Sequence, residues 1–484
     1  MTIRIFLIFL LIINQINCFS QNDFQSELQK ILIQPEYKNA TIGISVVDLK
    51  NGMQVLELNS GKLMIPASTL KIITSSAALE LLGPDYRYKT KVGFKGEIKN
   101  INELNGDLVI IGGGDPTLGS KYFKNLVENE SFITTWVQKL KLAGIGKING
   151  NIIFDNSIYD NEKIPPAWNW GDLGNYYGAG VDAFSCYDNM FGITFKSPKM
   201  AGEKTEIIGI NPNIDELVIF NEVVASDDNR DLANVYGSPF DKNRVIRGSI
   251  PKNRDAFTIK AAIQNPGNLI AEQLQQELQK QGVIFNGKTI FSKTELNNVT
   301  NIYIHESPEL ADIVKILNYE SVNLFTEHLV MQIAAEKLGM GNRESGIKLI
   351  KEFWQSKGIK TEYLFMEDGS GLSHFNAVSP SFLTSVLFFM AQKSPNSEIF
   401  INSLPNAGNG TLSAFNTTSF PGNTLTAKSG SMTRVRCYAG YLQLDSGDKT
   451  AFSIMFNHYS GSGSKLVNEI ENLLISMKKI NIIK

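Results

Sequence analysis

The amino-acid sequence predicts a mixed α/β (α+β) fold, because strand and helix patterns recur at both ends of the chain and differ from the texture between them. Near the N-terminus, Thr41–Asp48 and Gln54–Leu58 alternate in polarity and flank an Asn-Gly turn, the signature of a β-hairpin. Near the C-terminus, Tyr438–Leu444 and Thr450–Phe456 form a second pair of strands. From about Lys89 to Thr294 the chain has short strands, glycines and loops.

Length and composition describe an ordinary globular chain. Its 484 residues suit about three domains of ~150 residues each. A hydrophobic content of 43% and a charged content of 19% provide for a large core. The net charge of −2 gives no reason to expect nucleic acid or an anionic membrane surface as a partner.

Residues 1–20 have the features of a secretory signal peptide. Arg4 precedes the apolar run Ile5–Ile13, which is too short to span a bilayer, and small side chains suited to cleavage near Ser20 follow it. A lipoprotein attached at Cys18 is disfavoured because the bulky Asn17 precedes that cysteine. No other segment is long and apolar enough to cross a membrane, so we expect an exported, soluble product.

Removal of the signal peptide leaves two cysteines, Cys186 and Cys437. Two cysteines so far apart in sequence do not make a disulfide scaffold. We expect both thiols to be free and buried, and a single bridge between them stays open.

The remaining elements follow from hydrophobic periodicity and from helix-ending residues. A helix from Ile72 to Leu82 ends at Gly83-Pro84, and strands are expected at Gly106–Ile111 and Asn149–Asp155. The region at about 189–258 is less regular and is a possible nested sub-domain. Helices are expected at Asp23–Leu32, Trp136–Leu142, Leu310–Leu317, Leu324–Leu338, Glu344–Gln355, Pro380–Ala391 and Lys465–Lys478.

A glycine-rich turn, Gly112-Gly113-Gly114-Asp115-Pro116, follows a predicted strand. Its spacing is not that of a dinucleotide-binding loop, and Pro116 lacks the amide that a phosphate would need. The turn is therefore expected to be structural.

The pair Ser68 and Lys71 is the leading candidate for a nucleophile and its base. Pro66 precedes an amphipathic run, which places Ser68 in the first turn of a helix and Lys71 almost one turn later. A partly desolvated lysine can take the proton of a serine hydroxyl, and the free N–H groups of a helix start suit an oxyanion. Only this instance of Ser-x-x-Lys opens an uninterrupted apolar helix. Other instances include Ser249/Lys252, Ser345/Lys348, Ser462/Lys465 and Ser476/Lys479.

A second motif, Ser321-Val322-Asn323, lies between two predicted helices. In acyl transfer through a serine ester, the Ser321 hydroxyl can relay a proton towards a leaving amine. The amide of Asn323 can hold both Lys71 and the backbone of a substrate.

A third motif, Lys428-Ser429-Gly430, precedes the C-terminal strands. The Lys428 charge and the Ser429 hydroxyl suit the terminal carboxylate of a substrate, and Gly430 lets a substrate lie against a strand edge. The backbone N–H groups of Ser68 and Ser431 would form the oxyanion hole.

Together, these motifs resemble those of the serine-active penicillin-binding and β-lactamase superfamily. Within it, the chain resembles the D-Ala-D-Ala carboxypeptidase/endopeptidase family of penicillin-binding protein 4. The deciding feature is the 250-position gap between Lys71 and Ser321, which is far longer than in β-lactamases. Supporting stretches are Pro66–Thr69, Leu82–Asp85, Gly114–Leu118, Asp368–Ser373 and Gly410–Leu412.

The resemblance implies a transpeptidase-like domain, an antiparallel sheet covered by helices, built from 21–90 and 295–484, with inserted domain(s) at 91–294. It also implies a periplasmic serine D-Ala-D-Ala carboxypeptidase, with or without endopeptidase activity, that acts on peptidoglycan stem peptides. β-Lactams would be its covalent inhibitors. Asp172, in a Trp-x-Trp-x-Asp segment, would meet the free side-chain amine of the peptide's diamino acid. No metal or cofactor is expected.

Three alternative functions can be tested against the same residues. A β-lactamase shares the acylation residues but needs a route to rapid deacylation, for which no residue is identifiable, and a non-catalytic binding protein would not need every reactive group. A Ser-His-Asp hydrolase would need one of the histidines in a triad motif, and none lies in one. The histidines are His305, His328, His374 and His458.

Overall fold

A computed structural model describes residues 23–99, 102–123, 131–215 and 217–482 of the chain. The predicted signal peptide, residues 1–20, lies outside these residues. The chain divides into two compact units, which are described one at a time. The first comprises the described residues within Met1–Pro84, Val314–Ser321 and Lys348–Lys484, and the second those within Asp85–Ile313 and Val322–Ile347.

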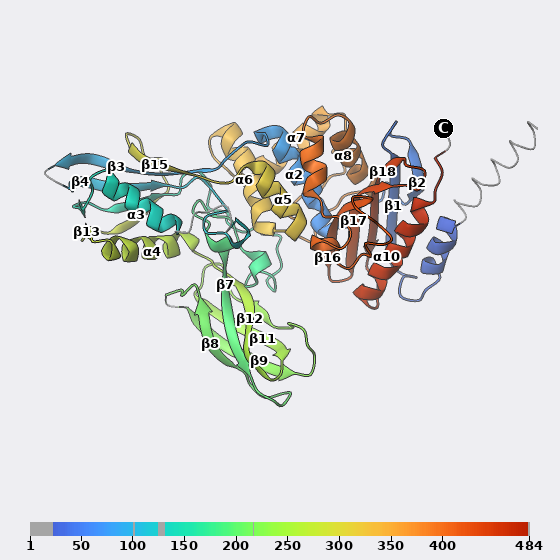
Figure 1. Cartoon of the computed structure of the whole chain (residues 1–484), viewed down its shortest axis with the longest axis horizontal. Coiled ribbons are helices and arrows are strands. Elements are labelled where there is room, and N and C mark those ends of the chain that lie inside the picture. The colour runs from blue at the N-terminus through green and yellow to red at the C-terminus, as the bar shows by residue number, and fades with distance from the viewer. Residues whose placement is uncertain (1–22, 100–101, 124–130, 216, 483–484) are drawn as a thin grey trace, which may run out of the picture. The chain divides into compact units, whose positions relative to one another are not determined.

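The first unit is built on a five-stranded antiparallel sheet, which is blue and red in Figure 1 because its strands come from both ends of the chain. Its strand order is β16-β17-β18-β1-β2. The predicted hairpin is present, and the C-terminal pair gains a third strand that contains the Lys428 motif. The bounds are β1 Thr41–Asp48, β2 Gln54–Leu58, β16 Leu425–Met432, β17 Val435–Gln443 and β18 Lys449–Asn457.

Helices cover both faces of this sheet. Ile44 and Val46 of β1 share a core with Leu466 and Ile470 of the C-terminal helix α10. On the other face, Ser45 and the helix α8 residue Thr384 join their hydroxyls at 2.9 Å. Because both faces are covered, β1 is buried almost throughout, although its sequence alternates in polarity.

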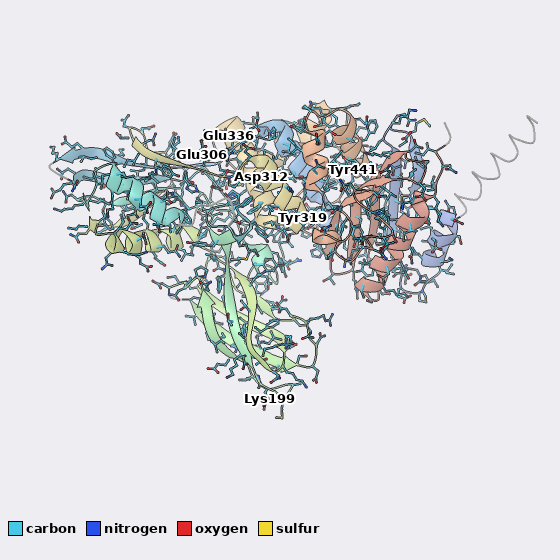
Figure 2. The ribbon with its side chains drawn as sticks, in the orientation of Figure 1. Lys199, Glu306, Asp312, Tyr319, Glu336 and Tyr441 are labelled. Atoms are coloured by element: carbon cyan, nitrogen blue, oxygen red, sulfur yellow. The ribbon has the colours of Figure 1, made fainter. Side chains whose placement is uncertain are left out.

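A further bond joins α8 to the sheet, since the hydroxyl of Tyr441 in β17, labelled in Figure 2, donates to the Leu387 carbonyl at 2.9 Å. The helices of this unit are α2 Lys71–Leu82, α8 Pro380–Gln392, α9 Ser397–Ser403 and α10 Gly463–Lys478, together with helical residues 23–32. Residues of α5 (Leu310–Glu320) and α7 (Arg343–Ser356) belong to both units.

The second unit contains a larger mixed sheet and two three-stranded sheets. The mixed sheet has the order β13-β5-β4-β3-β15, with β6 paired to β4 and β14. Helices α3 and α4 pack on it through a core that includes Trp136, Leu140 and Leu274. These elements are β3 Lys89–Lys99, β4 Glu103–Ile111, β5 Lys147–Ile148, β6 Ile152–Asp155, β13 Ile284–Phe285, β14 Thr289–Ser292, β15 Thr300–Glu306, α3 Phe132–Leu142, α4 Pro266–Lys280 and α6 Asn323–Leu338.

The segment expected to be irregular, about 189–258, is in fact regular β structure. Its strands form the sheets β12-β7-β8 and β10-β11-β9, and β9 runs parallel to β11. Local alternation did not reveal these strands because many of their side chains are only partly buried. The bounds are β7 Met190–Ser197, β8 Glu206–Asn211, β9 Val218–Ser226, β10 Asn234–Tyr236, β11 Asn243–Pro251 and β12 Arg254–Ala262.

The fold class is confirmed as mixed α/β, whereas the domain limits remain predictions. Cys186 and Cys437 are free and buried. Among the described helices, none has the length and apolar character needed to cross a membrane.

Candidate active site

Ser68 lies in a short helical turn that leads directly into α2. The sequence predicted the first turn of an α-helix, but residues Ala67–Leu70 form a tighter 3-10 turn. Ala67 has φ +45°, a left-handed value that is rare for a residue with a side chain. Such strained backbone persists only where the surrounding structure enforces it, and it is common at functional sites.

Lys71 is the first residue of α2 and is completely buried. Its Nζ donates to the Ser68 Oγ at 2.9 Å and to the carbonyl of Ser370 at 2.6 Å. The Lys71 side-chain nitrogen is therefore removed from bulk water and held beside the serine hydroxyl, where the neutral amine could take the hydroxyl proton.

The loop that supplies the Ser370 carbonyl is held rigidly by the buried Asp368. This carboxylate accepts hydrogen bonds from the backbone N–H of Gly371 at 2.8 Å and of Ser373 at 2.6 Å. It also accepts one from Asn376 Nδ2 at 2.9 Å. In the sequence, Asp368–Ser373 stood out only as a stretch that supports the family resemblance. Its contact with Lys71 could not be foreseen, because the acceptor is a backbone carbonyl distant in sequence.

Strand β16 lies against the Ser68 turn and carries Lys428, which is fully buried. Burial, and next the neighbouring charge of Lys71, hold the pKa of Lys428 well below its usual range. Lys428 Nζ donates to the Ser429 carbonyl at 2.9 Å. Ser429 is buried, and Ser431, two residues further along the strand, is exposed.

Gly430 of β16 lies tightly against the Ser68 turn. A Cβ at this position would lie 2.6 Å from the Pro66 carbonyl oxygen and 3.0 Å from the backbone nitrogen of Ser68. Both contacts are with backbone, which cannot move aside as a flexible side chain can. Glycine is therefore required for the strand and the turn to meet.

Replacing Gly430 with valine is expected to lower kcat/KM for a D-Ala-D-Ala peptide by about 100-fold, because a ~1 Å shift of reacting groups costs that much. Steady-state kinetics would measure the loss. Gly61, an exposed glycine of the same unit with open space at its Cβ and no left-handed φ, supplies the matched control Gly61→Val. Near-normal kinetics of Gly430→Val would show that the close contact is unimportant.

Ser321 occupies the turn between α5 and α6. Its φ of +60° is left-handed, so this serine, like Ala67, has a backbone conformation that its side chain disfavours. The first unit thus contains Ser68, Lys71, Ser321 and the Lys428 motif.

Asn323 and Asp172 belong to the second unit, where Tyr177 contacts both. Asn323 Nδ2 donates to the Tyr177 carbonyl at 2.8 Å, and the Tyr177 hydroxyl donates to Asp172 Oδ1 at 3.3 Å. Burial and then the Asp172 charge raise the pKa of the Tyr177 phenol. The sequence analysis singled out Asn323 and Asp172 but not Tyr177.

The serine–histidine hydrogen bond between Ser185 and His328 does not make a catalytic pair. His328 Nε2 lies 2.8 Å from the Ser185 hydroxyl, but both side chains are completely buried, and burial lowers the pKa of His328 to about 3. Neither group can reach a substrate. Within the described ranges there is also no cluster of three or more histidine, cysteine, aspartate or glutamate residues that could hold a metal ion.

Comparison with known proteins gives one consistent result. The model of the D-Ala-D-Ala carboxypeptidase 3 (S13) family matches residues 24–475. The D-alanyl-D-alanine carboxypeptidase DacB of Haemophilus influenzae is 27% identical over 436 residues, which cover 89% of this chain and 88% of the relative. The D-alanyl-D-alanine carboxypeptidase of Actinomadura sp. (strain R39) is 26% identical over 471 residues, 92% of this chain and 83% of that protein.

Two solved structures have a fold similar to that of this chain. The crystal structure of penicillin binding protein 4 from Haemophilus influenzae has a TM-score of 0.80 at 24% identity, over 94% of this chain and 99% of that one. A crystal structure of the same protein in complex with a β-lactam has a TM-score of 0.72 at 25% identity, over 93% and 98%.

Proposed function

Because the chain belongs to the D-Ala-D-Ala carboxypeptidase 3 (S13) family, it is a serine-type D-Ala-D-Ala carboxypeptidase, and we propose that Ser68 is its nucleophile. The observation that carries this assignment is the 2.9 Å hydrogen bond from Lys71 Nζ to Ser68 Oγ. The rare backbone at Ala67 supports it, since strain of this kind is typical of functional turns.

In the proposed reaction, Ser68 Oγ attacks the carbonyl carbon of the penultimate D-alanine while a neutral Lys71 takes the hydroxyl proton. The C–N bond to the terminal D-alanine breaks, and Ser321 relays a proton to the departing amine. Water then hydrolyses the ester and restores the Ser68 hydroxyl. The side-chain amide of Asn323 positions the substrate backbone. Its Nδ2 bond to the Tyr177 carbonyl fixes the orientation of the amide.

The third motif would hold the terminal carboxylate and the developing oxyanion. Lys428 would supply a positive charge for the carboxylate, and the Ser429 hydroxyl would donate a hydrogen bond to it. The negative charge of the bound carboxylate would in turn favour the protonated form of Lys428. The N–H groups of Ser68 and Ser431 form the oxyanion hole, and Gly430 keeps their strand and turn close together.

The natural substrates would be peptidoglycan stem peptides, and β-lactams would be covalent inhibitors that acylate Ser68. A relative of known structure forms a complex with a β-lactam, which supports the second statement. Cleavage near Ser20 would place the enzyme in the periplasm. Its catalytic domain would comprise 21–90 and 295–484, with inserted domain(s) at 91–294 and a nested sub-domain at about 189–258.

The test is to incubate the protein with penicillin and map the adduct by mass spectrometry. We expect a long-lived ester on the peptide that contains Ser68, together with release of D-alanine from disaccharide-pentapeptide. An adduct on another serine would overturn the assignment. Rapid turnover of penicillin without an accumulating adduct would instead favour a β-lactamase.

Asp172 is proposed to bind the side-chain amine of the diamino acid in the peptide. Asp172→Ala is expected to raise KM at least tenfold for peptides with a free side-chain amine, because the lost charge-assisted hydrogen bond contributes about 1.5–3 kcal/mol. Peptides with an acetylated amine serve as the matched substrates and should be unaffected. An equal loss for both kinds of peptide would contradict the role of Asp172.

A further inference from the structure

A cavity separate from the acyl-transfer residues lies in the first unit, at the edge of the sheet opposite to β16. It has a volume of about 700 Å³ and is bounded by Asn51 and Gly52 of the β1–β2 turn, by α8 and by the loop after α7. Strand β16 and the β1–β2 hairpin occupy opposite ends of the five-strand order. At ~4.8 Å per strand, roughly 19 Å separates the two edges. None of the residues assigned to acyl transfer lines this cavity.

The charge of the cavity is entirely positive. Lys357, Lys360 and Lys393 line it, and its lining includes no aspartate or glutamate. These three lysines make no ion pair with any part of the chain that the structure describes. Lys393 instead lies 5.9 Å from the ring centre of Phe388, and Lys357 lies 5.1 Å from that of Phe353. A ring contact holds an ammonium group but does not neutralise it.

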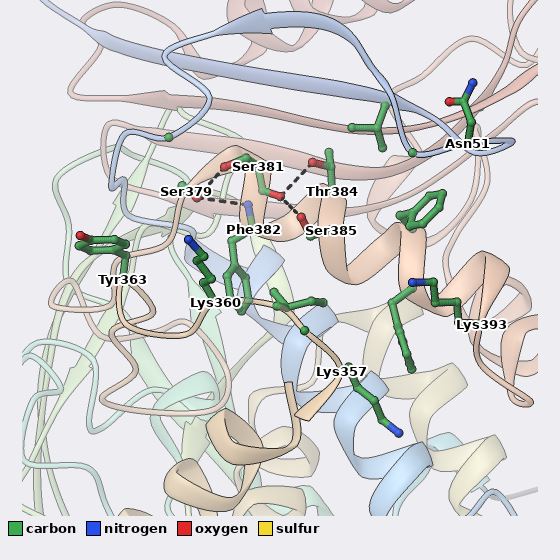
Figure 3. A pocket seen from close by; sticks show the side chains of 17 residues that line it. Asn51, Lys357, Lys360, Tyr363, Ser379, Ser381, Phe382, Thr384, Ser385 and Lys393 are labelled. Atoms are coloured by element: carbon green, nitrogen blue, oxygen red, sulfur yellow. Dashed lines mark hydrogen bonds between the residues drawn. The ribbon is translucent and has the colours of Figure 1, made fainter. Parts of the chain in front are cut away.

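The rest of the lining also favours an anion. Helix α8 lines the cavity along its length, from its capping residue Ser379 to Lys393 just after its end, and its first turn has no acidic residue. Ser379 caps this helix, and the Ser379 and Ser381 hydroxyls meet at 3.0 Å (Figure 3). Figure 3 also shows Lys360 and Lys393 on opposite sides of the cavity, so each lysine can bind one of two separated negative groups of the same ligand.

An aromatic surface completes the cavity. The Tyr363 side chain lines it and is 64% exposed, which leaves a flat face to which a sugar ring can bind. An extended ligand with sugar rings and spaced carboxylates would satisfy both the cations and the aromatic face.

We propose that this cavity is a second binding site, which holds a carboxylate-bearing glycan-peptide strand of the cell wall while another peptide is cleaved at Ser68. The proposal rests on the proposed function, because it takes the occupant from the polymer on which the enzyme acts. The second site would raise the affinity for polymeric substrate through an effective concentration, without touching the reacting atoms.

The test compares two substrates, uncross-linked glycan strands that carry pentapeptides and the free disaccharide-pentapeptide. The double variant Lys360→Glu/Lys393→Glu is expected to raise KM for the strands about tenfold at low salt, with kcat unchanged. Kinetics with the small substrate should stay at the level of the unmodified protein. The difference should shrink at high ionic strength, because exposed charges are screened.

The control is Lys38→Glu/Lys449→Glu, which changes the net charge equally at exposed lysines of the same unit outside the cavity. An equal effect of both double variants would show a general charge effect and overturn the proposal, as would an unchanged KM for the strands. If the unmodified protein cleaves neither substrate, the proposed function itself fails. If the unmodified protein cleaves both substrates but the Lys360→Glu/Lys393→Glu variant does not raise KM selectively for the strands, only the proposal of a second binding site fails.

Discussion

Replacing Ser68 with alanine is expected to abolish both release of D-alanine from D-Ala-D-Ala peptides and formation of the penicillin adduct. The reaction proceeds through an ester on this oxygen, so loss of the oxygen removes the covalent path. In other serine peptidases, removal of the nucleophile costs about 10⁶-fold in kcat. Assays of D-alanine release and intact-protein mass spectrometry after penicillin treatment would measure the two losses.

The control for this prediction is Ser249→Ala, which alters a serine in another Ser-x-x-Lys segment. Ser249 lies in β11 of the second unit, so its loss should leave both activities unchanged. Thermal unfolding of Ser68→Ala should stay within a few degrees of the unmodified protein, because the change removes one partly exposed hydroxyl. A folded Ser68→Ala variant that still bound penicillin covalently would exclude Ser68 as the nucleophile.

Much of the first unit could be predicted because local pattern and final structure agree there. The alternation of Thr41–Asp48 and Gln54–Leu58 is the alternation of two paired strands, and Gly83 ends α2 with a φ of +91° that suits glycine. The three-residue spacing of Ser68 and Lys71 also predicts correctly that their side chains lie side by side, since three residues make about one turn in an α-helix or a 3-10 helix.

What the sequence concealed depends on contacts between distant segments. The carbonyl of Ser370 accepts a hydrogen bond from Lys71 because Asp368 holds the loop in place. Every residue has a backbone carbonyl, so the residue types in the sequence do not mark this acceptor. Gly430 was expected to admit substrate, yet its closest neighbours are the Pro66 carbonyl and the Ser68 amide. Tyr177 likewise acts partly through its backbone: its carbonyl accepts a hydrogen bond from Asn323, while its hydroxyl donates to Asp172.

Replacing Lys71 with methionine is expected to lower the rate of Ser68 acylation by penicillin about 1,000-fold, within the range that a general base contributes. Methionine keeps most of the volume of the buried side chain but cannot accept a proton. It also leaves the Ser370 carbonyl without this donor, at a cost of about 1–3 kcal/mol in stability. Stopped-flow measurement of acylation would give the rate, and thermal unfolding would give the stability.

Lys71→Arg separates a role as base from a role as fixed charge. Arginine retains the positive charge and the donors towards Ser68 and Ser370, but it does not lose its proton in proteins. If Lys71 is the base, the arginine variant should acylate as slowly as the methionine variant. Recovery of most of the rate with arginine would mean that a positive charge beside the serine is sufficient. In that case the proton of Ser68 must leave by another route, and the hydroxyl of Ser321 would be the next group to replace.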